Sequence, residues 1–121
     1  MYKFWGKIRK QNQRGKKLGF PTANINLHTN IPEGIYVSTT KVDKHKYQSV
    51  TFIGSAKTFN EKSFQAETYI LDFNRILYGQ WIKVELLKKI RDNQKFDSAA
   101  ELINQMKKDE KEARKFFSLP T

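Results

Sequence analysis

Alternation of apolar and polar residues with a period of two is the feature that most constrains the fold of this chain. Such segments, rich in β-branched and aromatic side chains, predict half-buried strands. Turn-forming residues such as Pro32, Gly54 and Gly79 separate them, so we expect an antiparallel barrel or sandwich. Residues 2–9 alternate, residues 34–42 are rich in β-branched side chains, and residues 47–55, 64–73 and 80–90 repeat these strand signals.

The C-terminal part of the chain changes to a helical period. Ser98 and Glu101 form an S-x-x-E capping box, and Asp97 suits the positive end of a helix dipole. We therefore predict one amphipathic helix over about 98–117, closing an all-β barrel over about 1–92. With 121 residues, residues 1–121 are expected to form a single domain. The apolar positions at helical spacing are Ala99, Leu102, Ile103, Met106, Ala113 and Phe117.

The charge is strongly positive, with 23 Lys and Arg against 12 Asp and Glu, a formal net charge of +11. This favours anionic partners, although a solvated lysine-rich surface explains it equally well. The chain has no cysteine, which excludes a disulfide framework and a thiolate metal site. It also lacks an apolar run of roughly 20 residues and the apolar core of a signal peptide. We expect a cytoplasmic protein that does not bind membranes.

A basic, glycine-containing loop lies within RGKKLGFPTANI, residues 14–25. Backbone N–H groups of such a loop can approach phosphate oxygens, and its lysines add charge. It is not a P-loop, because Pro21 follows the apolar Phe20 where that motif requires Lys and a helix. A phosphate cradle and a solvated basic turn both remain open. The loop residues concerned are Gly15, Lys16, Lys17 and Gly19.

Thr22 and Asn24 stand two positions apart, directly after this loop. In extended backbone such residues point to the same side. A hydroxyl and a carboxamide oxygen are neutral, hard ligands that can complete the shell of a magnesium ion bound to ATP phosphates. The alternative is a turn closed by hydrogen bonds from these side chains to the backbone.

Glu67 is a carboxylate on an apolar strand face, shared with Tyr69, Leu71 and Phe73. A carboxylate in such surroundings must be paired or have a raised pKa. Either condition suits a general base that accepts a proton from a hydroxyl. The alternative is an edge strand that exposes Glu67 to water.

Two further readings concern isolated histidines and interleaved aromatic residues. His28 and His45 have no partners at ligand spacing, which argues against a zinc site. Aromatic residues interleaved with Lys and Arg also fit a basic, RNA-binding β-barrel that stacks single-stranded bases. The aromatic residues in question are Phe4, Trp5, Phe20 and Tyr36.

Taken in order, four segments resemble the riboflavin kinase (flavokinase) family, including the kinase module of bacterial bifunctional riboflavin kinase/FAD synthetases. GKKLGFPTANI resembles the Gly-Arg-x-Leu-Gly-Phe-Pro-Thr-Ala-Asn signature, and PEGIYVS resembles a Pro-x-Gly-Val-Tyr strand entry. FIGSAKTF resembles an Ile-Gly-x-x-Pro-Thr-Phe turn. Residues 66–109 resemble the Glu-x-His-Ile-Leu-Asp-Phe, Leu-Tyr-Gly, Leu-Arg and Lys-Phe-x-Ser segments that follow.

The resemblance implies a six-stranded antiparallel Greek-key barrel with a C-terminal helix. It also implies transfer of the γ-phosphate of ATP to the 5′-hydroxyl of riboflavin, giving FMN and ADP, with Mg²⁺ as cofactor. Thr22 and Asn24 match the metal-binding residues, and Glu67 matches the catalytic base. Arg91 and Phe96 match the flavin-binding flap. The residues that match the nucleotide-binding segment are Gly15, Lys16, Lys17, Gly19, Pro21, Thr22 and Asn24.

The chain departs from the family pattern at Gln11, Lys16, Lys57 and Tyr69, where glycine, arginine, proline and histidine are usual. A lysine keeps the charge of arginine but not its bidentate fork, so nucleotide affinity is the quantity in question. A flavin-binding regulatory relative with little turnover therefore stays open. The His-x-Gly-His motif of the adenylyltransferase domain is absent, so we expect the chain to stop at FMN. The expected partners are ATP and riboflavin, without nucleic acid, in a monomer or in part of a longer FAD synthetase chain.

Overall fold

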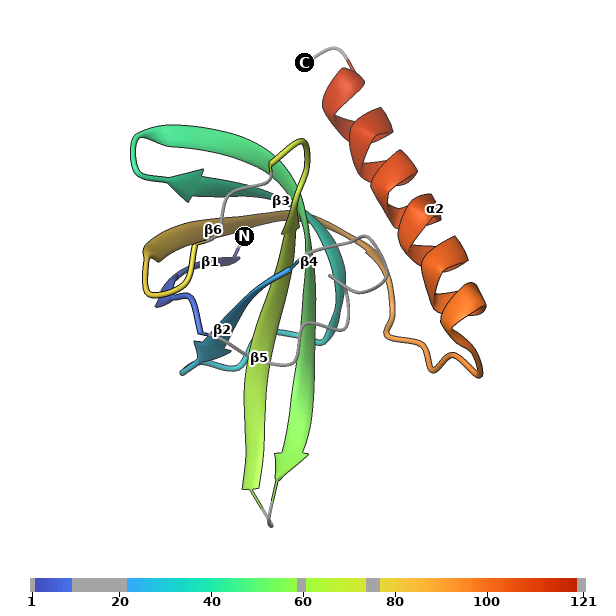
Figure 1. Cartoon of the computed structure of the whole chain (residues 1–121), viewed down its shortest axis with the longest axis horizontal. Helices are drawn as coiled ribbons and strands as arrows, with labels where there is room; N and C mark the ends of the chain where they lie inside the picture. Colours follow the sequence, from blue (N-terminus) through green and yellow to red (C-terminus); the bar gives the residue numbers. More distant parts are fainter. Residues whose placement is uncertain (1, 10–21, 59–60, 74–76, 120–121) are drawn as a thin grey trace.

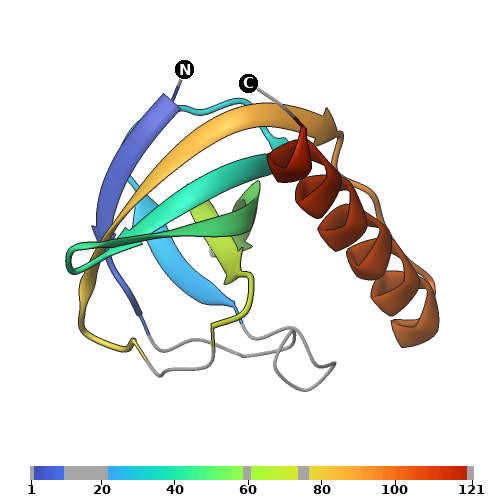
Figure 2. The same ribbon diagram turned by 90° about the horizontal axis from the view of Figure 1, so that it is seen from above.

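The structure, a computed structural model, describes residues 2–9, 22–58, 61–73 and 77–119, with the side chains of 55–58 and 61–63 left out. Six antiparallel strands pair in the order β1-β6-β3-β4-β5-β2. Seen from above, they curve into a nearly closed ring with α2 outside it (Figure 2). The elements are β1 Tyr2–Lys7, β2 Ala23–Leu27, β3 Gly34–Val42, β4 His45–Thr58, β5 Glu61–Ile70, β6 Trp81–Arg91 and α2 Ala99–Ser118 (Figure 1).

The predicted strands and helix are present, with one further strand that alternation alone did not indicate. The strand predicted over 64–73 is β5, Glu61–Ile70, and Leu71 and Asp72 instead form a turn. Strand β3 has the predicted bounds, and α2 begins after Ser98, whose side chain accepts a hydrogen bond from the Glu101 backbone. Glu101 Oε2 in turn accepts a hydrogen bond from the backbone N–H of Asp97, one residue before the cap. Strand β2 is only ANINL, and its two asparagines have low strand propensity. Pairing with β5 holds it in place.

The barrel interior is an apolar core with a polar chain of hydroxyl groups across it. Ser38 Oγ lies 2.7 Å from Thr51 Oγ1, which lies 2.9 Å from Thr68 Oγ1, so these buried groups satisfy one another. The apolar part is formed by residues from all six strands and the loops that join them. Its buried members are Phe4, Ile8, Ile25, Ile31, Tyr36, Val42, Ile53, Ala66, Ile70, Leu77, Ile82, Val84 and Leu86.

The barrel closes where the edge strands β1 and β2 approach each other. The backbone N–H of Arg9 donates to the carbonyl of Asn24 at 2.9 Å, beyond the end of β1. Nearby, Gly6 packs so closely on Ile25 that a Cβ at this position would overlap the isoleucine side chain. A glycine is therefore required for β1 to approach β2.

Gly6→Ala should lower the free energy of unfolding by about 1–3 kcal/mol, because the added methyl group would overlap the side chain of Ile25 where β1 approaches β2. Urea denaturation followed by circular dichroism measures the change. Ile25→Ala provides the control, since it removes the colliding atoms at the cost of a cavity. The double variant should be less destabilised than the sum of the single variants, and strict additivity would contradict the proposed contact.

A second apolar layer lies outside the barrel, where α2 covers part of the sheet. Tyr69 Oη donates to Glu110 Oε1 at 2.9 Å, and Arg114 pairs with Asp72 at 2.9 Å, which fixes the helix to β5 and the turn after it. No helix in the described part of the chain is both long and apolar enough to cross a membrane. The layer consists of Val37, Leu71 and Ala113, with Val50, Tyr69, Ile90, Phe116 and Phe117 against them.

Candidate active site

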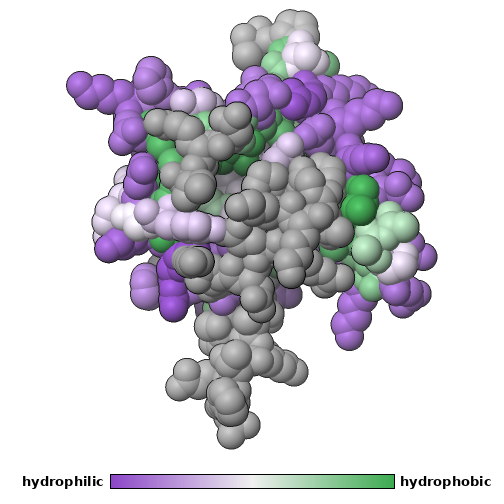
Figure 3. Space-filling view, viewed as in Figure 1, coloured by the Kyte–Doolittle hydropathy of each residue, from purple (hydrophilic) through white to green (hydrophobic). Residues whose placement is uncertain are grey.

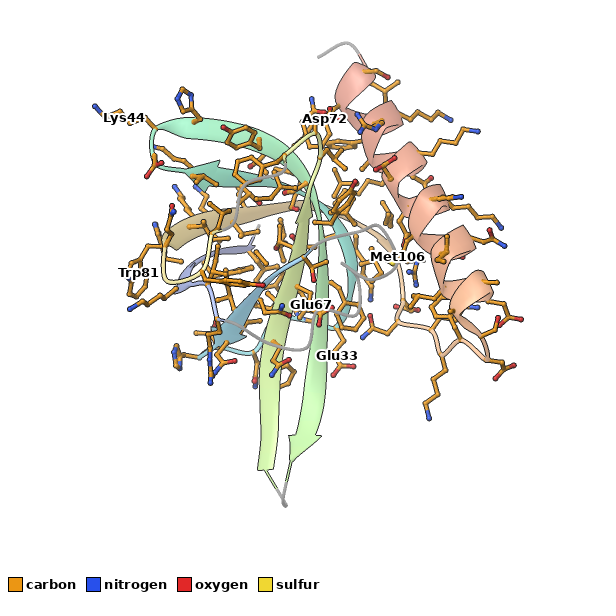
Figure 4. All side chains as sticks on the ribbon, viewed as in Figure 1. Glu33, Lys44, Glu67, Asp72, Trp81 and Met106 are labelled. Carbon is orange, nitrogen blue, oxygen red and sulfur yellow. The ribbon has the colours of Figure 1, made fainter. Side chains whose placement is uncertain are left out.

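A pocket of about 510 Å³ opens between the outer face of the sheet and α2. Figure 4 shows Met106 on the helix and Glu67 on β5 at its two sides. The segment between β6 and α2 forms a third wall. The pocket is lined by Thr22, Ile35, Val50, Phe52, Glu67, Tyr69, Arg91, Gln94, Lys95, Phe96, Leu102, Met106 and Asp109.

The sheet supplies the site as one row of side chains that crosses five strands. Arg91 of β6 pairs with Ile35, and Ile35 pairs with Phe52. Phe52 pairs with Glu67, and Glu67 pairs with Asn24 of β2. Residues directly opposite on neighbouring strands point to the same face. At the usual strand spacing, Arg91 and Glu67 lie three strands or roughly 14 Å apart along the sheet.

Glu67 is half-buried and faces this pocket, and burial raises the pKa of its carboxyl above the ordinary 4.5. Strand β5 pairs with β4 on one side and with β2 on the other. The alternative in which an edge strand exposes Glu67 to water is therefore wrong. A carboxylate with a raised pKa at the wall of a pocket is suited to accept a proton.

Asn24 and Thr22 are brought to the same end of the row. Asn24 is 1% exposed, and its Oδ1 is buried without a hydrogen-bond partner among the described residues. Thr22 lines the pocket itself. Burial of a carbonyl oxygen without a hydrogen-bond partner costs free energy relative to its exposure to water. Contact with a ligand can offset that cost. Among the described residues, this oxygen therefore takes part in no hydrogen bond that would close a turn.

The donor set fits magnesium held together with a nucleotide. Among the described residues, His, Asp and Glu form no group of three that could hold a metal. Thr22 and Asn24 offer two neutral oxygens, a set that suits Mg²⁺ when phosphates supply the negative charge. The residues present therefore fit the ion that the sequence resemblance implies.

Arg91 lies at the opposite end of this row of paired residues from Asn24, and a carboxylate of α2 holds it there. Its Nε and Nη2 donate to the two oxygens of Asp109 at 2.8 and 2.7 Å, and Gln105 donates to Asp109 at 3.0 Å. The guanidinium group lies 6.0 Å from the centre of the Phe96 ring. Asn93 donates to the carbonyl of Ile53 at 3.1 Å, which ties the following segment to β4. The predicted flap residues Arg91 and Phe96 thus share one pocket with Glu67.

The other predicted site residues cannot be placed. Gly15, Lys16, Lys17, Gly19 and Pro21 lie outside the described residues, as does Gln11.

The Flavokinase family model, described as riboflavin kinase, matches residues 1–117. The chain belongs to the riboflavin kinase family. The structure of riboflavin kinase from Trypanosoma brucei superimposes with a TM-score of 0.68 at 25% identity, covering 98% of this chain and 80% of that one. A Streptococcus pneumoniae structure described as a macrolide-efflux protein gives a TM-score of 0.86 at 36% identity, covering 93% and 38%. The six-stranded barrel with a C-terminal helix is thus the riboflavin kinase fold.

Curated relatives place the same module within longer proteins. The chain is 45% identical to the trifunctional protein RibF/MnmA of Mycoplasmoides gallisepticum, covering 93% of this chain and 18% of that protein. It is 39% identical to the bifunctional riboflavin kinase/FMN adenylyltransferase of Bacillus subtilis, covering 88% and 36%. The chain therefore spans less than two fifths of the length of these relatives.

Sequence reasoning missed Asp109, which left a signal in the sequence, and Phe52, whose role follows only from the structure. Asp109 lies in the apolar stripe of the helix, between Met106 and Ala113, where a carboxylate needs a partner. Phe52 is 37% exposed and stands next to Glu67 on the neighbouring strand. Tyr69, at a position where the family often has histidine, bonds to the helix. Burial and its bond to Glu110 raise its pKa to about 12.

Proposed function

We propose that this chain is an ATP-dependent riboflavin kinase, which transfers the γ-phosphoryl group of ATP to the 5′-hydroxyl of riboflavin and gives FMN and ADP. We further propose that residues 1–121 act as one domain. The observation that carries the proposal is the position of Glu67, half-buried at the pocket wall and paired with Asn24. This pairing supports the assignment of Glu67 as the base and Asn24 as a metal ligand, because phosphoryl transfer to a hydroxyl uses both beside the reacting groups.

The pocket suits an elongated flavin. Its middle is apolar and aromatic, with Val50 and Phe52 from the sheet and Leu102 and Met106 from α2. A tricyclic flavin ring can stack there, close to Arg91. The ribityl chain would then extend along the row toward Glu67, which brings its terminal hydroxyl to the carboxylate.

The reaction makes one bond and breaks one bond at phosphorus. The 5′-oxygen of riboflavin attacks the γ-phosphorus, and the bond from that phosphorus to the oxygen bridging to the β-phosphate breaks, releasing ADP. The hydroxyl proton passes to the carboxylate of Glu67, which also orients the attacking oxygen. α2 and the segment after β6 cover the pocket and limit access of water, which would otherwise compete as acceptor.

Thr22 and Asn24 would hold Mg²⁺ through their side-chain oxygens. When bound, the ion supplies positive charge against the phosphate oxygens of ATP. The nucleotide phosphates would be bound by the sequence segment before Thr22, which contains Gly15, Lys16, Lys17, Gly19 and Pro21 and lies outside the described residues. Removal of magnesium by excess EDTA should stop turnover.

The direct test is an endpoint assay with riboflavin, ATP and MgCl₂, followed by chromatographic separation of the flavins. We expect FMN and ADP to form in equal amounts. Omission of riboflavin should leave ATP intact, which excludes a contaminating ATPase. Riboflavin binding without ADP formation would instead indicate a flavin-binding relative that has lost turnover.

Asp109→Asn should raise KM for riboflavin about tenfold, which corresponds to a loss of ~1.4 kcal/mol of binding free energy, with a smaller change in kcat. The asparagine keeps one acceptor but loses the charge that fixes Arg91 at the pocket, so Asp109 acts as a positioning residue. Steady-state kinetics and quenching of flavin fluorescence measure the effect.

The matched control is Asp72→Asn, which weakens the ion pair between Asp72 and Arg114 of α2. Neither residue lines the pocket. Asp72 lies toward the other end of the helix from the pocket (Figure 4). KM should stay near the wild-type value in this variant. Equal effects of the two substitutions would mean that α2 is merely loosened and that Arg91 has no specific role.

A further inference from the structure

The outer face of β1 and β6 carries two exposed tryptophans, on the side of the barrel away from α2. Trp5 is 62% exposed and Trp81 is 67% exposed. Figure 4 shows Trp81 projecting outward at the opposite side of the barrel from Met106. Large aromatic side chains that remain in water mark an interaction surface. The surface is separate from the candidate active site, whose lining includes neither tryptophan.

A row of lysines continues from Trp5 across the neighbouring strands. Lys83 of β6 is paired with Trp5, Lys41 of β3 with Lys83, and Lys46 of β4 with Lys41. The side chains of Lys41 and Lys46 are exposed. Like charges directly opposite on paired strands repel one another and destabilise the sheet. The row contains no carboxylate to relieve this repulsion, and an anionic ligand would do so.

Aromatic rings and cations alternate on this face, both across the paired strands and along each strand. Lys7 is paired with Trp81 in the next row, so each tryptophan has a lysine beside it across the strands and along them. Lys83 Nζ lies 5.2 Å from the centre of the Trp5 ring. In the row on the other side of Trp5, Lys3 lies 4.0 Å from Glu85. In Figure 3, hydrophilic side chains predominate at the upper and left edges of the molecule, and hydrophobic side chains also appear near the right edge.

A groove of about 520 Å³ crosses β1 between Trp81 and β2. Arg9 adds a cation to it, and Asn26 and His28 line its far side. Oδ1 of Asn26 is buried and has no hydrogen-bond partner among the described residues. This oxygen can accept a hydrogen bond from a ligand that enters the groove.

We infer that this tryptophan–lysine face, formed by Trp5, Lys7, Lys41, Lys46, Trp81 and Lys83, binds single-stranded nucleic acid. Exposed bases stack on the indoles, and phosphates lie against the lysines. The alternation of ring and cation matches the alternation of base and phosphate along a strand. A duplex fits less well, because its bases are already stacked and paired.

This inference departs from the expectation that nucleic acid is not a partner. It also differs from the RNA-binding reading of the sequence, which counted Phe4 and Tyr36 among the stacking residues. Both side chains are buried, at 6% and 5% exposure, and cannot receive a base. Of the aromatic residues considered there and described in the structure, Trp5 alone is exposed and remains a stacking residue.

The test uses intrinsic fluorescence, because Trp5 and Trp81 are the only two tryptophans in the chain. Titration with an oligouridylate of about 12 nucleotides should quench the tryptophan emission, with an affinity that falls steeply as salt rises. Binding of a labelled oligouridylate, followed by anisotropy, should weaken by about 30-fold or more in Trp5→Ala/Trp81→Ala, because two stacking side chains are lost. FMN formation by the same variant should be unchanged, which separates this face from the active site.

Charge is tested by a matched pair of double variants. Lys41→Gln/Lys46→Gln should weaken binding and reduce the salt slope by about 1.4, whereas Lys107→Gln/Lys111→Gln on α2 removes the same charge and should leave both unchanged. Equal effects of the two pairs, or binding without quenching, would overturn the inference in favour of general attraction by a basic protein. Quenching by phosphatidylserine vesicles but not by oligouridylate would overturn it in favour of a lipid surface.

Discussion

Glu67→Gln should reduce the rate of FMN formation by about 10²–10⁴-fold while the barrel stays folded. Glutamine keeps the size of the side chain and can still contact the hydroxyl, but it cannot accept the proton. Because the carboxyl lies at the pocket wall opposite Asn24, no strand pairing depends on its charge. Chromatographic quantification of FMN measures the rate, and circular dichroism verifies the fold. Residual turnover above one tenth of wild type would exclude Glu67 as the general base.

The pH dependence offers a second measure of the same residue. Burial raises the pKa of Glu67 above 4.5, and the base must be ionised to act. The acid limb of kcat/KM should therefore fall at a pH above that of an ordinary glutamate and should be absent from the residual activity of Glu67→Gln. An acid limb at the same pH in both proteins would assign it to another group.

The raised pKa also predicts the direction of a stability change. Between the unfolded and folded pKa values the native state binds more protons at Glu67, so its contribution to stability falls as pH rises through the folded pKa. At neutral pH the ionised carboxylate thus opposes folding, and Glu67→Gln should be at least as stable as wild type. At a pH below both pKa values the two proteins should be similar. Thermal denaturation at two pH values tests the sign.

Asn24→Leu should lower kcat/KM for ATP by about 10- to 100-fold and raise the magnesium concentration needed for turnover. The substitution removes a buried oxygen that has no hydrogen-bond partner among the described residues. On the proposed assignment it would leave one fewer ligand for the ion. A readout that does not depend on catalysis is the rise in Tm on adding Mg-ATP, which reports binding to the native state. This rise should be largely lost in the variant.

The matched control for Asn24 is Asn26→Leu. Asn26 lies two residues further along β2 and pairs with Gln65 rather than Glu67. Its Oδ1 is likewise buried, with no hydrogen-bond partner in the described part of the chain. It should retain the rise in Tm and the turnover of wild type. Loss of both in Asn26→Leu would attribute the effect to disruption of β2, and a normal rise in Asn24→Leu would exclude Asn24 as a metal ligand.

Much of this molecule could be predicted from local patterns. The β-branched residues of 34–42 and the turn signal before them predicted the bounds of strand β3, and the capping box predicted the start of α2. A carboxylate at Glu67 on an apolar face identified this residue as a candidate base, but exposure on an edge strand stayed open until the structure placed β5 between β4 and β2. The order of the motifs then indicated the family.

The tertiary structure alone decided which distant residues meet. Cross-strand register joins Arg91 to Glu67 and Asn24, and Trp5 to Lys83 and its row, although the members lie far apart in the sequence. The same is true of Asp109, which reaches Arg91 only because α2 folds back over the sheet. Sequence period fixes which face a side chain occupies, because backbone geometry is local. Register and helix docking depend on how the buried faces of separate elements fit together, and no local pattern contains that fit.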